Sequence, residues 1–572
     1  MIRQVRIKRR DVPRSLPEGL HPVAARVLAA RGLKQAPDYS LAGLLPPSLG
    51  GMDQACRLLH QAIVDNQSIL VVGDFDADGA TGTALAVRGL RAMGARRVGW
   101  LTPDRVRHGY GLGTQLVSEI PDPVPDLILT VDQGVSSVEG VALARQRGMR
   151  VIVTDHHLPS EQLPAADAII NPQLPGERFP SACLAGVGVM FYLLMGLRAH
   201  VRDQGGFAGK QPRLDAWLDL VALGTVADLV PLDENNRRLV HQGLMRIRAG
   251  RCSPGVRYLL EVAGRNLRHV TAADLGFAAA PRLNAAGRLD DMGIGVRCLL
   301  AESESEAHAI AGQLDALNRE RQSIQAEMQE LAEEQAEEQA RRLAEQTRGQ
   351  PNGLCVFDPD WHSGVVGLVA GRLMDRLQRP VVAFAPADAT GGLLKGSARS
   401  PAGIHMRDLL VEIDTRQPGL IDRFGGHARA AGLSLSSANL ESFRECFDNI
   451  LESREFGEDV VWSDGALDGH WLTTETAEAL DRAGPWGQTW PAPLFDDRFQ
   501  VQERREVGSG HLKLRLKPLD GGASVDAIAF GAGRLCYQEL PDPLHVAYAL
   551  EVNRWKGQSR PQLRILYLVD RD

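Results

Sequence analysis

Between residues 68 and 160, the sequence alternates short apolar runs with segments of helical composition. The runs have the composition of strands and cover residues 69–73, 98–101, 126–131, 151–154 and 167–170. Helical segments separate them, including the Ala- and Leu-rich residues 80–93. Neighbouring parallel strands need a crossover connection, which is usually a helix. The alternation therefore predicts an α/β fold with a parallel sheet covered by helices on both faces.

Length and composition limit the remaining choices. The chain has 572 residues, enough for three or four domains at roughly 100–200 residues each. Its net charge is −7, so nucleic-acid binding would depend on local basic patches. The seven cysteines form no CxxC pair, which argues for reduced thiols and against a zinc ribbon. The basic N-terminus has no apolar core behind it, and no apolar run is long enough to span a membrane. We expect a cytoplasmic protein.

The rest of the chain changes character twice. Residues 302–347 have the composition of one long polar helix that carries a single apolar stripe. Such a helix is typical of a bridge between domains or of a coiled-coil dimer. Residues 354–357 and 381–384 have the composition of strands in a second α/β unit. The last stretch holds five of the eight tryptophans and alternating strands at 511–517 and 562–568, which predict a small β-barrel. The expected segments are residues 1–45, 46–301, 302–348, 349–456 and 457–572.

Acidic and histidine side chains directly follow three of the predicted strands. They are Asp74, Asp76, Asp78, Asp132, Asp155, His156 and His157. Because the carboxyl ends of parallel strands meet at one edge of the sheet, we expect these side chains in one crevice. Asp228, in the apolar segment LGTVADLVPL, is a further candidate. A lone aspartate after a strand is more often a helix cap or turn residue than a ligand, and a lone histidine is more often a surface or core residue with ordinary partners.

Close carboxylates repel one another, and desolvation adds to the cost of burying them. A divalent cation removes this conflict. A site rich in carboxylates, with imidazole and without thiolate, favours Mn²⁺, with Mg²⁺ as a substitute. Five or more ligands suit two ions with a bridging aspartate, an arrangement that hydrolyses phosphate esters in line. The sequence therefore predicts a two-metal phosphoesterase.

These residues stand in recognisable motifs. DFDADG, VDQG, TDHH and GTVADLVPL resemble the four motifs of the DHH phosphoesterase superfamily. KGSARS at 395–400 and RFGGHARAAGL at 423–433 resemble the serine–arginine segment and the GGH loop of its DHHA1 domain. GPWGQTWPAPLF at 484–495 and NRWKGQSRPQLRILYL at 553–568 resemble an OB-type domain, and PRLNAAGRL and HGYGL also match. The resemblance extends from residue 45 to the end and is closest to the superfamily's exonucleases specific for single-stranded DNA.

The resemblance implies an order of domains and a ligand set. A parallel-sheet DHH domain is joined by the long helix to a smaller α/β DHHA1 domain, and a C-terminal OB-like barrel follows. One ion is held by Asp76 and Asp132, and the other by Asp78, Asp132, His156 and Asp228. The family often has a histidine where this chain has Val72, and Asp74 is the candidate that compensates. His157 is implied next to the scissile phosphate, and Asp155 is implied as the carboxylate that orients a ligating histidine.

Two groups of residues are candidate substrate contacts. The first group comprises Arg105, His108, Arg282, Asn284 and Arg288. Arginine suits bidentate phosphate contact, although surface salt bridges explain such residues as well. The second group comprises Ser397, Arg399, Gly425, Gly426 and His427. Glycines let backbone N–H groups approach a phosphate, so this group predicts a site for a 5′-terminal phosphate.

The C-terminal barrel is a candidate grip on the strand. Its tryptophans would stack on bases, and Lys513, Arg515 and Lys517 would follow the backbone. Each tryptophan taken singly is better explained as a core residue, so the basic residues of 511–517 are the stronger evidence. The resemblance implies a 5′→3′ exonuclease acting in DNA recombination and repair. It also implies a monomer that works with single-strand-binding protein and a RecQ-type helicase.

Two other functions fit parts of the sequence. The same metal motifs serve hydrolases of short oligonucleotides, cyclic dinucleotides or pyrophosphate, but these substrates need neither the long helix nor the C-terminal domain. A non-catalytic replication protein built on this fold would have lost metal ligands, and here the aspartates and both histidines are present.

Overall fold

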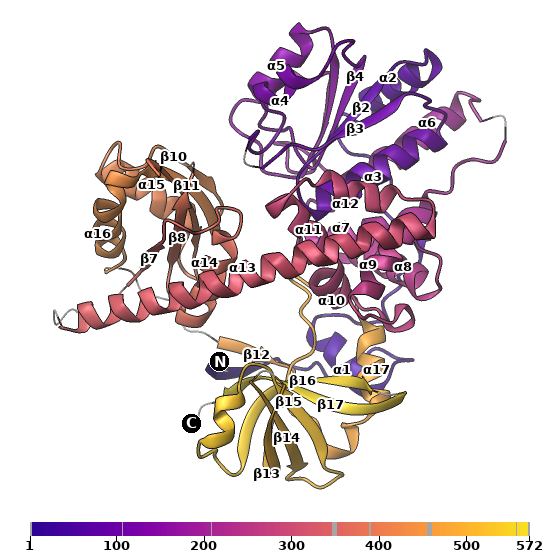
Figure 1. The fold of residues 1–572 in the computed structure, drawn as a ribbon. Helices are drawn as coiled ribbons and strands as arrows, with labels where there is room; N and C mark the ends of the chain where they lie inside the picture. The colour runs from indigo at the N-terminus through magenta and orange to yellow at the C-terminus, as the bar shows by residue number, and fades with distance from the viewer. Residues whose placement is uncertain are drawn as a thin grey trace. The chain divides into compact units, whose positions relative to one another are not determined.

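The computed structural model describes residues 3–105, 107–207, 209–345, 352–387, 391–452, 454, 460–508, 510–555 and 557–569. The chain forms two compact units (Figure 1). The first unit combines Ile2–Asn318 with Val460–Asp572, and the second comprises Arg319–Asp459. The expected boundaries after residues 348 and 456 lie outside the described residues, and the bounds of the five segments stay a prediction.

A five-stranded parallel sheet is the centre of the first unit. Its order is β3-β2-β4-β5-β6. The strands are β2 (Ile69–Gly73), β3 (Val98–Leu101), β4 (Leu127–Val131), β5 (Arg150–Thr154) and β6 (Ala168–Ile170). Strands β2, β4 and β5, which precede the predicted ligands, are adjacent. The sequence prediction of these strands is confirmed to within one residue at each end.

Helices cover both faces of this sheet (Figure 1). On one face, α2 (Met52–Val64), α3 (Ala77–Ala92) and α6 (Gly186–Asp203) pack into the main core. On the other face, α4 (Thr114–Glu119) and α5 (Val138–Gln146) enclose a smaller apolar cluster. Val72 belongs to this smaller cluster and is fully buried. Its side chain therefore packs in the core.

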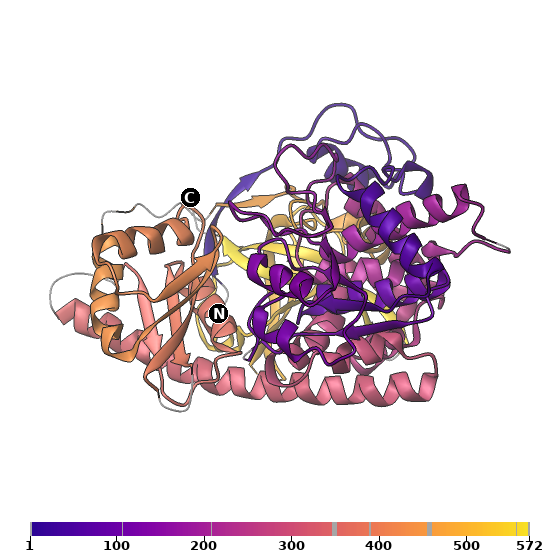
Figure 2. The same ribbon diagram turned by 90° about the horizontal axis from the view of Figure 1, so that it is seen from above.

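A helical layer continues the first unit. It comprises α7 (Leu218–Ala227), α8 (Glu234–Arg248), α9 (Pro254–Val262), α10 (Ala272–Asp274), a π-helical segment (Leu275–Ala279), α11 (Ala280–Leu289) and α12 (Gly293–Leu300). The long helix α13 (Glu304–Glu345) follows and is continuous in both views (Figures 1 and 2). This confirms the predicted helix. The apolar stripe differs at its end, because Leu331 is exposed while Ala332 and Ala336 are buried.

The second unit contains a mixed five-stranded sheet in the order β10-β11-β9-β8-β7. Its strands are β7 (Leu354–Phe357), β8 (Val381–Pro386), β9 (Leu393–Arg399), β10 (Arg423–Gly426) and β11 (Ala430–Ser436). Only β7 and β8 are parallel among these pairs. The helices are α14 (Val366–Leu377), α15 (Met406–Arg416) and α16 (Leu440–Leu451). The predicted second α/β unit is confirmed.

The C-terminal strands form a barrel. Its members are β13 (Phe495–Val507), β14 (His511–Pro518), β15 (Val525–Ala529), β16 (Leu544–Trp555) and β17 (Gln558–Val569), closed by the pairing of β16 with β17. The N-terminal strand β1 (Arg3–Arg9) pairs in parallel with β17 and with β12 (Val460–Ser463). The first residues of the chain therefore extend the C-terminal sheet, which the sequence analysis did not foresee.

Arginine–tryptophan contacts join the barrel to the rest of the first unit. Arg31, after α1 (Pro22–Ala30), pairs with Asp464 at 2.7 Å and lies over the ring of Trp486. The guanidinium of Arg237 on α8 lies 4.0 Å from the ring centre of Trp490. Both tryptophans flank the helix α17 (Thr474–Ala483) on its C-terminal side. No described helix is long and apolar enough to cross a membrane.

Candidate metal centre

Three adjacent strand ends bring the predicted ligands together. Asp74 and Asp76 follow β2, Asp132 follows β4 and His156 follows β5. Asp76 is the N-cap of α3, and its carboxylate accepts hydrogen bonds from the backbone N–H groups of Asp78 and Gly79. Asp132 has a φ of 63°, a left-handed conformation that non-glycine residues rarely adopt and that is concentrated at functional sites.

Two helices of the first unit complete the site. Asp78, in the first turn of α3, accepts hydrogen bonds from the N–H groups of Gly186 (2.6 Å) and Val187 (2.9 Å) at the start of α6. The positive end of the helix dipole therefore faces this carboxylate. Asp228 is the C-cap of α7. The acid within an apolar segment is thus placed where the helix ends.

The side chains form three overlapping groups whose ligand atoms all lie within 4.8 Å of one another. These groups are Asp74, Asp76 and Asp132; Asp78, His156 and Asp228; and Asp132, His156 and His157. Nε2 of His156 lies 3.0 Å from Oδ1 of Asp132 and 3.5 Å from Oδ2 of Asp228. Asp132 and His156 each belong to two of the groups and thereby connect all three.

Several buried polar atoms of the metal centre lack the partners that a bound cation would provide. Among the described residues, Oδ1 of Asp74, Oδ1 of Asp132 and Nε2 of His156 are buried without a hydrogen bond. The last two atoms lie 3.0 Å apart, but not in hydrogen-bonding geometry. Such atoms are costly unless a partner offsets their desolvation.

Burial, followed by the charges of neighbouring aspartates, raises the pKa of Asp132 well above its usual range and that of Asp78 to about 7. Burial lowers the pKa of His156 to about 4, which leaves a neutral imidazole able to bind a metal. The donor set fits hard divalent cations.

Asp155 holds the second histidine. Oδ1 of Asp155 lies 2.8 Å from Nδ1 of His157 and accepts the backbone N–H groups of His156 and His157. Burial opposes the charged imidazolium, but the hydrogen bond and the charge of Asp155 raise the pKa of His157 overall. Tyr110 donates its hydroxyl to the carbonyl of Asp132 at 3.2 Å. Asp155 therefore orients the ring of His157, whereas it contacts His156 only through the backbone.

Arg105 lies beside the carboxylates. Its guanidinium lies 4.0 Å from the ring centre of Phe75, and its Nε donates to the carbonyl of Gly287 at 3.2 Å. Burial lowers its pKa, and the charges of Asp74 and Asp76 oppose that effect.

The other candidate contacts of the first unit have protein partners. His108 accepts the N–H of Asp104 and lies 3.0 Å from Glu119. Arg282 pairs with Asp315 of α13 at 2.7 Å. Asn284 accepts the N–H of Ala77 at 2.8 Å, so it caps the helix that presents Asp78. Arg288 lies in the last turn of α11.

The candidate phosphate residues of the second unit lie on neighbouring strands. In the sheet register, Gly425 faces Gly432, and Gly432 faces Ser397. Nη1 of Arg399 donates to Oγ of Ser397 at 3.0 Å. Gly426 ends β10, and the N–H of His427 donates to Ala430 within the turn. The two sequence segments are thus brought together in one sheet.

Two glycines that the sequence analysis missed shape the metal centre. A Cβ atom on Gly186 would lie 2.5 Å from Cβ of Asp132, and one on Gly224 would lie 2.8 Å from Oδ1 of Asp78. The side-chain amide of Gln133 donates to the carbonyls of Val72 and Gly73 and ties β4 to β2. Gln133 and Gly224 stand in the motifs VDQG and GTVADLVPL, whereas Gly186 stands in none of the quoted motifs. The contacts of all three residues come from elements distant in the chain.

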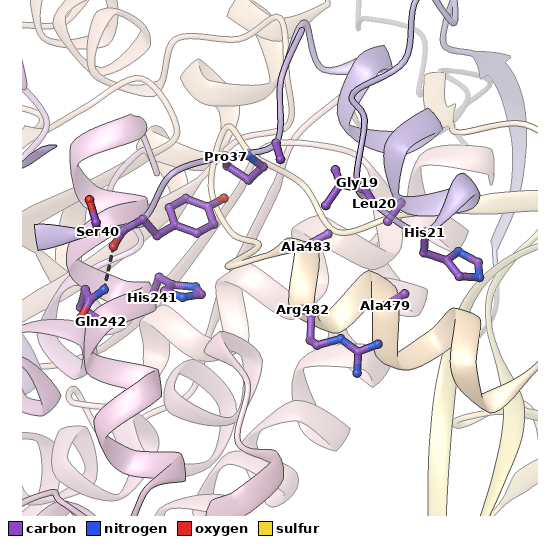
Figure 3. Close-up of a pocket in the computed structure, with 13 residues that line it drawn as sticks. Gly19, Leu20, His21, Pro37, Ser40, His241, Gln242, Ala479, Arg482 and Ala483 are labelled. Carbon is purple, nitrogen blue, oxygen red and sulfur yellow. Dashed lines mark hydrogen bonds between the residues drawn. The ribbon is translucent and has the colours of Figure 1, made fainter.

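A cavity of about 520 Å³ lies elsewhere in the first unit, where the N-terminal segment meets α8 and α17 (Figure 3). His241, Gln242 and Arg482 are among its lining residues, and Gln242 donates to the carbonyl of Tyr39. None of the predicted metal ligands is among its described lining residues.

In the barrel, Lys513 and Arg515 both pair with Asp526. Trp462 and Trp555 are exposed, so the core interpretation is wrong for these two.

Comparison with known proteins gives matches along the whole chain. Family models match residues 68–225 (DHH family, N-terminal domain), 350–453 (DHHA1 domain) and 463–567 (RecJ OB domain). The chain is 50% identical over 97% of both chains to the single-stranded-DNA-specific exonuclease RecJ of Dickeya dadantii. It is 46% identical over 99% of both chains to that of Escherichia coli K12.

Two crystal structures of RecJ from Thermus thermophilus are similar to this structure. The complex with Mn²⁺ has a TM-score of 0.80 at 31% identity, and the complex with Mg²⁺ has 0.77 at 30%. Each match covers 100% of this chain, and 80% and 79% of those chains respectively.

Proposed function

The chain belongs to the RecJ family of single-stranded-DNA-specific exonucleases, and we propose that it removes mononucleotides from single-stranded DNA in the 5′→3′ direction. It is a hydrolase that needs divalent cations and acts on single-stranded DNA. The observation that supports the catalytic assignment best is the group of buried ligand atoms without partners at the ends of β2, β4 and β5.

The site would hold two divalent ions, with Mn²⁺ preferred and Mg²⁺ as a substitute. Asp74, Asp76 and Asp132 would hold the first. Asp78, His156 and Asp228 would hold the second. Asp132, whose Oδ1 lies 3.0 Å from Nε2 of His156, would be shared between the two ions. The family often has a histidine ligand at the position of Val72. Asp74 would replace that ligand, since its Oδ1 is buried without a hydrogen bond among the described residues. When bound, the ions supply an activated water and neutralise the phosphate charge.

The protein itself orients the reacting groups. Asp155 fixes Nδ1 of His157, which leaves Nε2 to face the substrate phosphate or the leaving oxygen. The raised pKa favours the protonated imidazole, which is the form that a proton donor requires. Asn284 accepts the backbone N–H of Ala77, which lies between Asp76 and Asp78. The N–H of Gly186, at the start of α6, donates to the carboxylate of Asp78.

Arg105 is proposed to contact the strand near the metal centre, since its guanidinium lies beside carboxylates that ions would neutralise. His108, Arg282, Asn284 and Arg288 would act mainly by positioning. In the second unit, Ser397, Arg399, Gly425, Gly426 and His427 form a candidate site for the 5′-terminal phosphate. Arg399 is half-buried, and desolvation lowers its pKa, so an anion would be a favourable partner.

We further propose a cytoplasmic monomer that acts in DNA recombination and repair. Single-strand-binding protein and a RecQ-type helicase are the proposed protein partners, because a nuclease of this specificity needs exposed single strands. The support for these partners is family membership.

The test is digestion of a single-stranded DNA about 30 nucleotides long in Mn²⁺, labelled in turn at the 5′ and the 3′ end. Immediate release of labelled mononucleotide from the 5′ end, with gradual shortening of the 3′-labelled strand, is the expected result. An intact strand, together with rapid hydrolysis of a dinucleotide, would indicate a small-substrate phosphoesterase. Chelation by EDTA should stop digestion, and added Mn²⁺ should restore it.

A further inference from the structure

The N-terminal strand β1 concentrates positive charge in a protein whose net charge is −7. Its sequence, RQVRIKR, is followed by Arg10 and contains no acid. Val5 is buried, whereas Arg6 and Lys8 are exposed, as expected for a strand with one face on the core. Arg9 is neutralised by Asp496 at 2.8 Å. Lys8, which is exposed, and Arg10, which is half-buried, add further positive charge to this part of the surface.

An exposed tryptophan lies directly beside these cations. Lys8 is paired with Trp462 of β12 in the register of the two parallel strands. Nζ of Lys8 lies 4.8 Å from the ring centre of Trp462, and Cζ of Arg10 lies 5.7 Å from it. The residue Trp462 is nevertheless 43% exposed. We call Lys8, Arg10 and Trp462 the β1–β12 face.

The charge of Arg10 is not balanced by its nearest acid. Asp464 lies 3.8 Å from Arg10, but it is already engaged by both terminal nitrogens of Arg31, at 2.7 and 3.0 Å. Nε of Arg10 has no hydrogen-bond partner among the described residues. Two arginines thus share one carboxylate, which leaves an excess of positive charge on this face.

We propose that the β1–β12 face binds single-stranded DNA away from the metal centre, with Trp462 packing against a base and Lys8 and Arg10 contacting phosphates. Cations next to an aromatic surface are the elements by which proteins hold single strands without reading their sequence. Charges protect an outer strand from pairing with other chains, but β1 lies between β12 and β17, and such protection does not explain an exposed tryptophan on β12. The proposal rests on the proposed function for the identity of the bound strand.

The test measures binding apart from hydrolysis. A fluorescent oligo(dT) about 30 nucleotides long is titrated with the full chain in EDTA, at several salt concentrations between 50 and 200 mM. Trp462→Ala and Trp462→Leu should each weaken binding at least about fivefold without changing the salt dependence, because stacking is uncharged. Lys8→Gln should reduce the slope of log affinity against log salt by about 0.7, the value for one phosphate contact on a single strand.

Lys34→Gln is the matched control, since Lys34 is exposed in the same N-terminal segment, and it should bind like the wild type. Trp462→Leu keeps an apolar side chain, so a loss common to both tryptophan variants, with unchanged thermal unfolding, excludes misfolding as the cause. Unchanged affinity and salt slope in Trp462→Ala and Lys8→Gln would overturn the proposal. Weaker binding of a polyglutamate probe by those variants would then identify an acidic polypeptide as the occupant.

The two proposals fail differently. If the wild type binds the strand but releases no nucleotide in Mn²⁺, the proposed function is wrong and the binding face stands. If the wild type digests the strand, and the variants bind and digest it equally well, only the β1–β12 face is wrong.

Discussion

At the scale of single residues, the metal centre combines structural and ligating roles in the same side chains. Asp76 caps α3 with one carboxylate oxygen, and Asp78 accepts two N–H groups from α6. These bonds fix the carboxylates before any ion arrives, which reduces the entropy lost on binding. Asp132 differs, because its Oδ1 has no hydrogen-bond partner among the described residues.

Asp132→Ala should therefore abolish turnover and leave strand binding in EDTA nearly unchanged. We expect hydrolysis to fall by more than about 100-fold, since even groups that only orient metal ligands contribute about 10–100-fold. Initial rates on labelled single-stranded DNA in Mn²⁺ measure the effect. Asp203→Ala, on the exposed end of α6, is the control and should keep full activity. Normal turnover in Asp132→Ala would contradict the assignment of Asp132 as a ligand.

Asp496 gives a pH-dependent contribution to stability. Burial opposes its ionisation, but His545, Arg9 and Ser463 together lower its pKa to about 2. A lowered pKa stabilises the fold above the unfolded value near 4, and this stability disappears as the pH falls through the folded value. Asp496→Asn should cost about 2 kcal/mol at pH 7 and nothing near pH 2. Urea unfolding of both proteins from pH 7 to pH 2 should show the two curves converging below pH 4, and a constant difference would contradict this cause.

Much of the metal centre could be predicted from the sequence, whereas the supporting contacts could not. Asp74, Asp76, Asp132 and His156 follow apolar runs, so local pattern alone places them at one edge of the sheet. Arg282 looks like a phosphate ligand until Asp315, on another helix, is seen to pair with it. The hydrogen bond by which Asn284 caps α3 could not be predicted from the sequence either, because Asn284 and Ala77 are distant in the chain.

At the scale of elements, the approach of α6 and α7 to the metal centre depends on glycine. Gly186 stands where α6 begins, and a Cβ atom there would lie within 2.8 Å of Cα, Cβ and Oδ1 of Asp132. Gly224 plays the same part on α7 next to Asp78. The close contact lets the first N–H groups of α6 reach Asp78 while Asp132 keeps its left-handed backbone.

Gly186→Ala should displace Asp132 and reduce hydrolysis by about 100-fold, since an error of about 1 Å in a reacting group has that effect. The measurement is the single-turnover rate at saturating Mn²⁺, with circular dichroism to verify folding. Gly312→Ala is the matched control, because a Cβ atom at Gly312 in α13 meets nothing within 4 Å. It should keep full activity and gain about 0.5–1 kcal/mol of helix stability. Equal activity of the two variants would show that α6 can move away from Asp132 without loss of hydrolysis, which would contradict the prediction.

The strands and helices of the parallel sheet were predictable because their apolar runs are short and punctuated. The N-terminal strand was not, since RQVRIKR has only two apolar residues and its partners lie near the other end of the chain. Leu331 shows the same limit on α13. The heptad spacing continues to that residue, but the neighbours of the helix bury Ala332 and Ala336 instead.

At the scale of the whole molecule, the catalytic sheet and the barrel form one compact unit although the chain leaves it between residues 319 and 459. Their junction is held by the buried pair of Arg31 and Asp464, whose side chains are 4% and 2% exposed. Arg31 also donates to the carbonyl of Pro491 and lies over Trp486. A buried charge pair of this kind contributes little net stability, but loss of one partner is costly.

Arg31→Met should destabilise the first unit by about 3–5 kcal/mol, because it leaves Asp464 buried without its main partner. The double variant Arg31→Met/Asp464→Leu should recover much of that loss. Urea unfolding followed by tryptophan fluorescence suits the measurement, because Trp486 and Trp490 lie at this junction. If the double variant were no more stable than the single one, the unpaired charge would not be the cause.

The pairing of β1 with β12 and β17 also imposes an order on the making of this protein. The ribosome releases β1 first, whereas Val460 and Tyr567, which face Arg6 and Arg3, emerge near the end. At about 5–20 residues per second, β1 waits on the order of a minute for its partners. Throughout that time Val5, buried in the finished enzyme, has no sheet to pack against. A chain cut short before residue 460 would lack both partners of β1, and this strand would stay unpaired.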